Sequence, residues 1–455
     1  MAVFTLQEIV RATGGKLLTG KPGQKVIGVS TDTRLIKRHQ LFVAIHGEAF
    51  DGHDFLGQAA AGGASAFVVH RQDVPFPAGK AVVLVDDTVK ALGRIARHHR
   101  QRFNIPVIGI TGSAGKTSTK ELVAAVMRQG YRVLFNKGTE NNHMGVPLTL
   151  LKLTVRHEAA VIEMGTNHPG EIDWLAQNAC PTVAVLTNVG ASHLQGLGSL
   201  KGVFEEKLSL IKYLPKDGCI ILNADDPYWA GLLKRKLSQH VISYAVEHKA
   251  DVMAHDLELK ASGISFCVDQ KLSFIVKSPS VGAVYNALAA IACGRFFRLS
   301  PAVIRQAISR AKPAKGRQCL IKSGGITFID DTYNANPVSY KNALATLKMF
   351  QGKGRRILVA ADMLELGKRS DDLHRDVGAS VAAAGIDAVF TYGKQAKLIA
   401  AAARRTGERL MVQAFEDQLR LTAAIRKYLH CGDVILFKGS RGMRMEKVLE
   451  GFLKG

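Results

Sequence analysis

The sequence predicts an α/β protein of three domains, and three observations lead to this prediction. A chain of 455 residues is too long for one hydrophobic core. In the central and C-terminal parts, near-continuous apolar runs alternate with helical stretches, which is typical of parallel sheets covered on both faces. This pattern begins after a linker at 103–106 and restarts after a second linker at 312–317. We therefore expect domains over residues 1–103, 104–313 and 314–455.

Each domain has its own strand pattern. The N-terminal domain is expected to be small and mixed, with strands over 26–34, 40–45, 65–70 and 81–87 and a helix from about residue 90. The central domain is expected to hold a parallel sheet, with strands over 105–110, 132–136, 159–164, 183–187 and 219–223. The C-terminal domain is expected to be a Rossmann-like, doubly wound unit, with strands over 326–331, 355–363, 388–393 and 433–440. Such sheets bind ligands at the carboxyl ends of their strands.

The composition is that of an ordinary soluble protein, with 47% hydrophobic and 22% charged residues. No apolar run approaches the roughly 20 residues that span a bilayer, and the N-terminus has no basic start followed by an apolar core. We expect a cytoplasmic protein without membrane insertion. The six cysteines lie at least 26 residues apart, which favours free thiols over a zinc site or a disulfide scaffold.

The formal net charge of +23 suggests an anionic partner. The basic residues are spread along the whole chain, and the densest cluster, at 94–102, is typical of one solvated helix face. There is no basic tail and no basic motif interleaved with aromatic residues, so we expect no nucleic-acid function. A phosphate-rich small substrate and a generally basic proteome explain the charge equally well.

The strongest functional signal is the stretch GITGSAGKTSTKEL at 109–122. It follows a predicted strand and opens a predicted helix over 117–130, the context of a phosphate-binding loop. The usual pattern would place a glycine at 110, where this chain has Ile110. A glycine-rich turn that merely opens a helix is the alternative. We predict a P-loop ATPase domain whose nucleotide contacts are Gly112, Ser113, Ala114, Gly115, Lys116, Thr117 and Ser118.

Nearly all of the remaining predicted strands are also followed by polar residues, which core packing alone does not require. Glu163 is either a hard oxygen ligand for a metal or the partner of a strand-end salt bridge. His193 is a ligand, a general base or a loop histidine. Asn141 and Asn142 either cap the following helix or bind a substrate. The residues themselves leave these alternatives open.

Taken together, these stretches resemble the Mur ligase family, the ATP-dependent amide ligases that build the peptide of the bacterial cell wall. The matching features are the Gly-x-x-Gly-Lys-Thr loop at 112–117, the Asn-rich Gly-x-Pro segment at 141–147, the strand-end glutamate, the Asn…His loop, the Asn-Ala-Asp-Asp turn at 223–226 and a downstream arginine. VSTDTR, LFVAIHGEAFDGHDF, EMGTNHPGEI, IDDTYNANPVSYKNAL, DMLELG and FKGSRGMRMEKV resemble the branch that adds D-alanyl-D-alanine. The resemblance spans nearly the whole chain.

The resemblance implies a mechanism. ATP would phosphorylate the terminal carboxylate of UDP-MurNAc-tripeptide, and the amine of D-Ala-D-Ala would displace the phosphate, giving UDP-MurNAc-pentapeptide in peptidoglycan synthesis. The implied cofactors are ATP and two Mg²⁺ ions, with Thr117 and Glu163 holding one ion and His193 helping to hold the other. Lys207 matches a position that is usually a carbamylated lysine and a metal ligand, although on its own it looks like a solvated helix lysine. Lys116, His193 and Lys207 are therefore the implied catalytic residues.

The resemblance also implies substrate contacts from separate domains. The residues that match the uridine diphosphate site are Ser30, Thr31, Asp32 and Arg34. A simple turn-forming cluster is the alternative for these residues. Those matching ATP contacts outside the loop are Asn286, Arg317 and Asp331. Those matching neighbours of the peptide substrates and the nucleotide are Asn141, Asn142, Tyr333, Asn334, Asn336, Lys438, Ser440 and Arg441.

The chain departs from the family pattern in three places. Gly282 and Ala283 stand where the family shows His-Asn before a helix, which leaves Asn286 to meet the adenine. The other two departures are Leu208-Ser209 for the common Gly-Glu and Ala361 for the usual glycine.

Two alternative functions stay open at this point. One is another ligase of the same superfamily, adding a different amino acid or glutamates to folate. The other is an inactive nucleotide-binding paralogue. The third residue of the accepted peptide, diaminopimelate or lysine, is not specified by these motifs. We expect a monomer in the bacterial cytoplasm.

Overall fold

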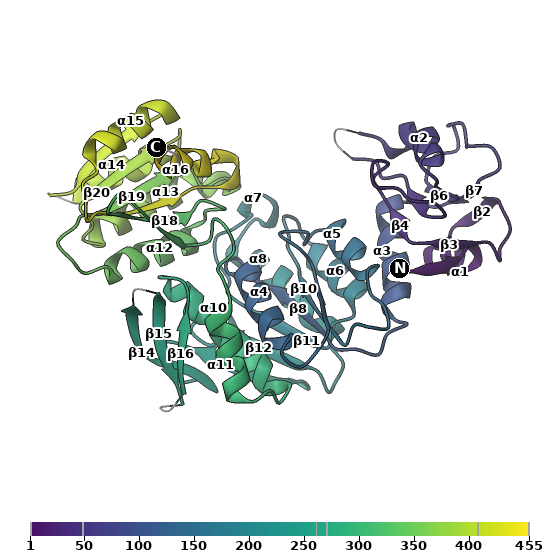
Figure 1. The fold of residues 1–455 in the computed structure, drawn as a ribbon, viewed down its shortest axis with the longest axis horizontal. Coiled ribbons are helices and arrows are strands. Elements are labelled where there is room, and N and C mark those ends of the chain that lie inside the picture. The colour runs from purple at the N-terminus through teal and green to yellow at the C-terminus, as the bar shows by residue number, and fades with distance from the viewer. Residues whose placement is uncertain (1, 48–49, 261, 270–271, 407–408, 454–455) are drawn as a thin grey trace.

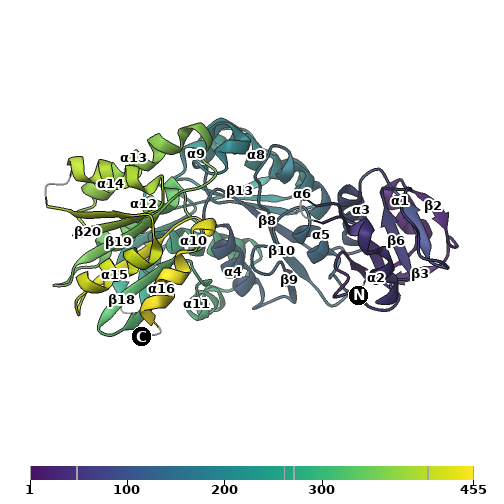
Figure 2. The ribbon, with the colours of Figure 1, turned by 90° about the horizontal axis from the view of Figure 1, so that it is seen from above.

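The computed structural model describes residues 2–47, 50–260, 262–269, 272–406 and 409–453. It consists of three α/β units that follow one another along the chain. Figure 1 shows the N-terminal unit at one end, the C-terminal unit at the other and the central unit between them. The view from above in Figure 2 shows the same row.

The N-terminal unit holds a sheet with the strand order β2-β7-β6-β5-β4, parallel except for β2, and a small β1-β3 pair. The strands are β1 (Val3–Thr5), β2 (Lys16–Thr19), β3 (Lys25–Ile27), β4 (Val29–Ser30), β5 (Leu41–Val43), β6 (Ala66–Val69) and β7 (Ala81–Leu84). The helices are α1 (Leu6–Thr13), η1 (Gly52–Phe55), α2 (Leu56–Ala61) and α3 (Thr88–Arg100). The strand predicted over 26–34 is wrong in extent, because Gly28 adopts a φ of +90° and divides it, and β4 ends at Ser30.

The central unit holds a sheet with the order β16-β15-β14-β13-β12-β11-β8-β10-β9. The strands are β8 (Val107–Thr111), β9 (Val133–Phe135), β10 (Ala159–Glu163), β11 (Val183–Leu186), β12 (Cys219–Asn223), β13 (His240–Ala245), β14 (Val252–Lys260), β15 (Gly263–Val268) and β16 (Leu272–Val276). The helices are α4 (Lys116–Met127), α5 (Gly145–Leu150), α6 (Glu171–Ala179), α7 (Leu194–Leu197), α8 (Leu200–Leu208), η2 (Ser209–Tyr213), α9 (Pro227–Leu233), α10 (Val281–Phe296) and α11 (Pro301–Arg310).

The predicted parallel part of this sheet, β8 to β12, is present as expected. The prediction was incomplete at the other edge, where β14, β15 and β16 pair antiparallel. Buried and exposed positions alternate along much of β14, so it lacks the continuous apolar run that marks the buried strands.

The C-terminal unit holds a sheet with the order β17-β18-β22-β19-β20-β21, parallel except for β17. The strands are β17 (Cys319–Ser323), β18 (Ile326–Asp331), β19 (Arg356–Ala361), β20 (Ala388–Tyr392), β21 (Met411–Phe415) and β22 (Val434–Lys438). The helices are α12 (Pro337–Met349), η3 (Gly367–Arg369), α13 (Ser370–Ala383), α14 (Ala396–Thr406), α15 (Gln418–Tyr428), η4 (Arg441–Met443) and α16 (Met445–Leu453). Four of these strands were predicted, and the edge strands β17 and β21 were not.

Helix α3 joins the N-terminal unit to the central one. It packs against α5 and α6 of the central unit. Its last residue, Arg100, is buried and donates hydrogen bonds to the carbonyls of Ala179 (3.1 Å), Phe103 (2.6 Å) and Ile105 (3.0 Å). This guanidinium ties the linker to the end of α6. Within the described ranges, no helix is long and apolar enough to cross a membrane.

Candidate active site

A cavity of about 1090 Å³ lies where the central and C-terminal units meet. Both units supply its walls, and the strand ends of both sheets open into it. The site residues predicted from the sequence that line this cavity are Ser113, Ala114, Gly115, Lys116, Thr117, Ser118, Asn141, Asn142, Glu163, His193, Asn286, Arg317, Asp331, Tyr333, Asn334, Asn336, Lys438, Ser440 and Arg441. The cavity therefore gathers most of the predicted site from segments far apart in the sequence.

Two groups of predicted residues lie outside the cavity lining. Gly112 and Lys207 lie behind the wall. Ser30, Thr31, Asp32 and Arg34 belong to the N-terminal unit, away from this cavity. There Asp32 accepts hydrogen bonds from the backbone N–H and the guanidinium of Arg34, and the Ser30 hydroxyl bonds the Asp32 backbone. These contacts are those of a local turn.

The loop between β8 and α4 explains why the usual phosphate-loop pattern fails. Ile110 is fully buried inside β8, so the loop begins later, at Gly112. Gly112 has a φ of +153°, and a Cβ on it would lie 1.8 Å from Thr187 Oγ1, so only glycine fits there. Gly115 has a φ of +83° and precedes the first turn of α4, which it leaves open to a ligand.

Hydrogen bonds from two neighbouring segments hold the loop in place. The segment after β11 contributes Asn188, whose Oδ1 accepts from the Ala114 N–H at 2.9 Å, and Gly190, whose carbonyl accepts from the Ser113 hydroxyl at 3.0 Å. Asn336 of the C-terminal unit donates its Nδ2 to the Ser113 carbonyl at 3.2 Å. The loop is thus fixed by both units that form the cavity.

Lys116 lies at the base of this loop. Its Nζ donates to the Gly112 carbonyl at 2.7 Å. Burial lowers the pKa of Lys116, Glu163 partly offsets this lowering and Arg317 adds to it. Bound phosphate oxygens would favour the charged ammonium, so the lysine is placed to neutralise an anionic ligand.

Glu163 ends β10 and is almost fully buried. Its Oε1 accepts hydrogen bonds from Thr117 Oγ1 (3.0 Å) and Asn141 Nδ2 (2.7 Å). Its Oε2 is buried and, among the described residues, has no hydrogen-bond partner. A hydroxyl and a carboxylate with a spare oxygen, facing a phosphate-binding loop, fit Mg²⁺, which takes few protein ligands and completes its shell with water and phosphate.

The two asparagines have different roles in this structure. Asn141 binds Glu163, as described above. Asn142 Oδ1 accepts from the N–H groups of Met144 (3.1 Å) and Gly145 (2.9 Å), so it caps the turn that leads into α5. Asn142 therefore caps this turn, and since both asparagines line the cavity, their substrate contacts stay predictions.

Sequence reasoning missed Lys120 on α4, which is fully buried. Its Nζ donates to the carbonyls of Asn136 (2.8 Å) and Gly138 (3.0 Å), pairs with Glu121 Oε1 (2.9 Å) and lies 3.9 Å from Glu163 Oε2. A lysine in an amphipathic helix normally looks solvated, and the carbonyls that bury this one come from the segment after β9.

Replacing Lys120 by methionine is expected to lower the free energy of unfolding by about 3 kcal/mol, because the buried Asn136 carbonyl, the Gly138 carbonyl and the Glu163 carboxylate lose the cation that they share. The midpoint of urea unfolding measures this loss. Lys137→Met, at an exposed lysine nearby, is the control and should leave the midpoint unchanged within about 0.5 kcal/mol. Equal midpoints for the two variants would contradict the assigned role.

Lys207 on α8 is also buried, with 1% of its surface exposed. Among the described residues its Nζ makes no hydrogen bond or ion pair. Burial lowers the pKa of this amine well below its ordinary value, and the nearby charge of Lys116 lowers it further, whereas Glu206 opposes the shift. A buried, unpaired and easily deprotonated amine is a reactive group.

Glu206, which sequence reasoning also missed, fixes the position of α8. Its carboxylate accepts from the N–H groups of Gly170 and Ile172, both at 2.6 Å, and from Thr166 Oγ1 at 3.2 Å. It thereby closes the N-terminal end of α6 and holds α8, with Lys207, behind the phosphate loop.

His193 lies between the central and C-terminal units. Its backbone is left-handed, with a φ of +53°, and its Nδ1 lies 2.6 Å from Glu365 Oε2. Glu365 follows β19, and its pKa is lowered mainly by this contact with His193. The histidine therefore meets a carboxylate of the other unit, a partner that the sequence did not suggest.

The C-terminal unit also reaches the loop through Arg317. One guanidinium nitrogen donates to Thr117 Oγ1 at 3.0 Å, and the guanidinium lies over the Tyr333 ring at 4.2 Å from its centroid. Arg441 approaches the same ring at 5.6 Å. Two cations therefore share one aromatic ring at the mouth of the phosphate loop.

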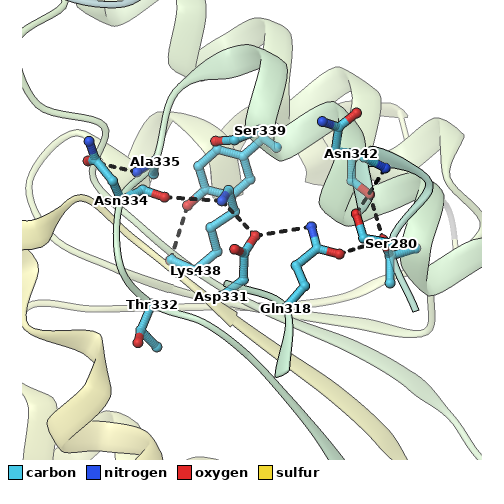
Figure 3. Close-up of polar contacts among 12 residues, drawn as sticks. Ser280, Gln318, Asp331, Thr332, Asn334, Ala335, Ser339, Asn342 and Lys438 are labelled. Atoms are coloured by element: carbon cyan, nitrogen blue, oxygen red, sulfur yellow. Dashed lines mark hydrogen bonds and ion pairs between the residues drawn. The ribbon is translucent and has the colours of Figure 1, made fainter. Parts of the chain in front are cut away.

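Behind this ring, Asp331 and Lys438 form a buried ion pair with an N–O distance of 2.7 Å. Lys438 also donates to the Asn334 carbonyl at 3.1 Å, and Gln318 Nε2 donates to Asp331 Oδ2 at 3.3 Å. Burial raises the pKa of Asp331, and Lys438 opposes the shift. Figure 3 shows Lys438, Asp331 and Gln318 joined in a row, with Ser280 and Asn342 at its end.

Ser440 and Asn336 fix the loops around this row. The Leu364 N–H donates to Ser440 Oγ at 2.9 Å, and Asn336 caps α12 by accepting from the Ser339 N–H at 2.9 Å. In the described part of the chain, no three or more His, Cys, Asp or Glu residues converge as a ready-made metal cluster. Any metal here would depend on ligands from the substrates or from a modified side chain.

Asn286, expected to meet the adenine, lies under the phosphate loop. Its Oδ1 accepts from Thr119 Oγ1 at 3.0 Å, and a Cβ on Gly115 would lie 2.6 Å from the same oxygen. The residue lines the cavity, so its nucleotide role stays a prediction.

Known proteins are similar in sequence to this chain in all three units. Sequence models match residues 25–100 (Mur ligase family, catalytic domain), 110–294 (Mur ligase middle domain) and 316–441 (Mur ligase, glutamate ligase domain). The UDP-N-acetylmuramoyl-tripeptide–D-alanyl-D-alanine ligase of Bacillus subtilis is 39% identical over 99% of this chain and 98% of its own length. The ligase of the same name from Escherichia coli is 37% identical over 92% of each chain.

Solved structures show the same similarity. A crystal structure of MurF from Acinetobacter baumannii has a TM-score of 0.90 at 31% identity and covers all of both chains. The MurF ligase of Thermotoga maritima, solved in complex with ADP, has a TM-score of 0.84 at 28% identity over 94% of this chain and 97% of its own. With its shortened phosphate loop, strand-end glutamate and full-length relatives, the chain belongs to the Mur ligase family.

Proposed function

We propose that this protein is an ATP-dependent ligase that joins D-alanyl-D-alanine to UDP-MurNAc-tripeptide, giving UDP-MurNAc-pentapeptide, ADP and phosphate. The observation that supports this most directly is the contact of Arg317 with Thr117, which brings the C-terminal unit onto the phosphate loop inside one cavity. The names of the full-length relatives specify the two substrates.

The reaction joins a carboxylate, a poor electrophile, to an amine. A carboxylate oxygen of the tripeptide attacks the γ-phosphorus of ATP, and the bond from that phosphorus to ADP breaks. The amine of D-Ala-D-Ala then attacks the acyl carbon of the acyl phosphate, loses a proton, and phosphate leaves as the amide forms. Closure of the two units over the cavity keeps water from the acyl phosphate, which water would otherwise hydrolyse.

Different side chains would stabilise the phosphates in different ways. Lys116 and Arg317 would meet the negative charge on the γ-phosphoryl group as it is transferred and the charge that develops on the departing ADP. Thr117 and Glu163 would hold one Mg²⁺, which supplies Lewis-acid stabilisation of the phosphate oxygens when bound. His193 would help to hold a second ion, oriented by Glu365.

Carbamylation of Lys207 would complete the second metal site. The neutral amine attacks the carbon of CO₂, an N–C bond forms, and one amine proton passes to solvent. This puts an anion in the place of a buried, unpaired amine, and the anion attracts the ammonium of Lys116. The burial of Lys207 and its lack of a partner support this proposal.

The remaining contacts follow the division into domains over 1–103, 104–313 and 314–455. The uridine diphosphate would bind the N-terminal domain at Ser30, Thr31, Asp32 and Arg34. The dipeptide and the nucleotide would lie against Asn141, Asn142, Tyr333, Asn334, Asn336, Lys438, Ser440 and Arg441. The enzyme would act in the bacterial cytoplasm, as a monomer.

A substrate-panel assay tests the proposal. Phosphate release with ATP and UDP-MurNAc-tripeptide is expected to require D-Ala-D-Ala and to stay at background with L-Ala, D-Glu, diaminopimelate or L-Lys as the amine. Folate with glutamate tests the distant superfamily alternative. Turnover with another amine but none with D-Ala-D-Ala would contradict the proposed substrate, and nucleotide binding without any turnover would favour an inactive paralogue.

A further inference from the structure

The cavity contains a second group of polar atoms, one helical turn from the phosphate loop along α10. Asn286 touches the loop at Gly115, and Gly282 lies four residues earlier, about 6 Å along the helix axis. Gly282, Ala283 and Ala345 line the cavity there, so the wall is built from very small residues. A nucleoside whose phosphates occupy the loop would bring its flat base to this wall.

Two polar side chains converge on this small-residue wall. A Cβ on Gly282 would lie 3.1 Å from Ser280 Oγ and 3.2 Å from Asn342 Nδ2. Ser280 is 5% exposed, and its oxygen accepts from the Gly282 N–H at 3.1 Å. Asn342 comes from α12 of the C-terminal unit and also lines the cavity.

Both groups have hydrogen-bonding capacity to spare. Among the described residues the Asn342 side-chain amide has no hydrogen-bond partner, and the Ser280 hydroxyl donates to no protein acceptor. A carboxamide presents one donor and one acceptor side by side, which matches the edge of adenine that carries its amino group and a ring nitrogen. Gly282 permits the approach, because a larger residue would push against the amide.

We propose that Asn342 reads the base of the bound nucleotide, with Ser280 beside it, so that base recognition in this chain comes from α12 rather than from the start of α10. The inference rests on the proposed ATP site. Figure 3 shows Asp331 and Gln318 in the row that leads from Lys438 toward Ser280, on the same side of the cavity as Asn342. It also explains how a chain with Gly282 and Ala283 at the start of α10 can still select adenine.

Direct ligand binding tests this proposal without relying on turnover. Asn342→Ala is expected to raise the Kd for ADP about tenfold, the effect of one lost specific hydrogen-bonding group. The Kd for tripolyphosphate, which has no base, should stay unchanged. Asn342→Asp keeps the shape of the side chain but removes the N–H donor, so it should also weaken ADP binding.

The base itself provides the second comparison. Inosine diphosphate carries a carbonyl in place of the amino group of adenine. The wild-type protein should bind it more weakly than ADP, and the preference should shrink to about twofold or less in Asn342→Ala. Lys348→Ala, at an exposed lysine on the same helix, is the control and should bind all three ligands as the wild type does.

Two results would overturn the proposal. One is an unchanged Kd for ADP in Asn342→Ala, and the other is an equal loss of ADP and tripolyphosphate binding, which would mean that Asn342 shapes the phosphate loop. A wild-type protein that binds ADP but does not use D-Ala-D-Ala would refute the proposed function and leave this inference standing.

Discussion

Lys116→Ala is expected to lower the rate of phosphate release about a thousandfold, which corresponds to roughly 4 kcal/mol of transition-state stabilisation. The ammonium is a half-buried cation at the base of the phosphate loop, and Nζ already lies 2.7 Å from the Gly112 carbonyl. Burial lowers the pKa of Lys116, whereas a bound phosphate favours its protonated form. The ammonium is therefore most stable when phosphate is present. Phosphate release under saturating substrates measures this effect.

The folded protein should tolerate the Lys116 change well. Removing a half-buried cation that has one carbonyl partner relieves desolvation, so the unfolding midpoint should fall little, if at all. Lys212→Ala, at an exposed lysine of the same unit, is the control and should retain full activity. A Lys116→Ala enzyme with more than about a tenth of the wild-type rate would contradict the role given to this loop.

Lys207→Ala is expected to lower turnover by a similar factor, about a thousandfold, and to respond to added acetate or formate. These small carboxylates can enter the space left by the side chain and replace the anion that the carbamate would provide. We expect them to raise the rate of the variant at least tenfold and to leave the wild type unaffected. Rates with and without added carboxylate, at constant ionic strength, measure the rescue.

The modification itself can be observed separately from activity. Mass spectrometry under mild conditions should find one CO₂ added to the wild-type chain and none added to Lys207→Ala. Lys201→Ala, at a highly exposed lysine of α8, should behave as the wild type in both measurements. An active enzyme whose Lys207 is mapped as unmodified, together with a variant that carboxylates do not rescue, would refute the carbamate.

The fold was largely predictable because its main signals are local. The strands around the site are continuous apolar runs, and Gly112 and Gly115 occupy positions where a Cβ or a right-handed backbone would clash with the loop. The missed strands β14, β17 and β21 lack a continuous buried apolar run. β14 is the clearest case, with exposed residues along one face.

The site was predictable only where its chemistry appears in the residue type. Glu163 ends a predicted strand and Lys116 lies in a glycine-rich loop, and both settings indicate a ligand site. Lys120 and Glu206 were missed, because each is buried by backbone groups distant in the sequence. A charged residue on a helix gives no sign of such burial. Glu365 was missed for a related reason, since its partner His193 lies 172 positions away, in another unit.

The contacts of Arg100 at the linker, which we call the joint, bear on the length of precursor that the protein can accept. The guanidinium binds carbonyls of the linker and of the end of α6, and α3 packs on α5 and α6, so the contacts set the span from the N-terminal unit to the phosphate loop. If the nucleotide end of the precursor is anchored at Ser30, the peptide must bridge that span with its own length. One amino acid adds about 3.5 Å, so a precursor shorter by one residue would stop that far from the γ-phosphate. With that anchor, the joint would select a precursor by its length as well as by its chemistry.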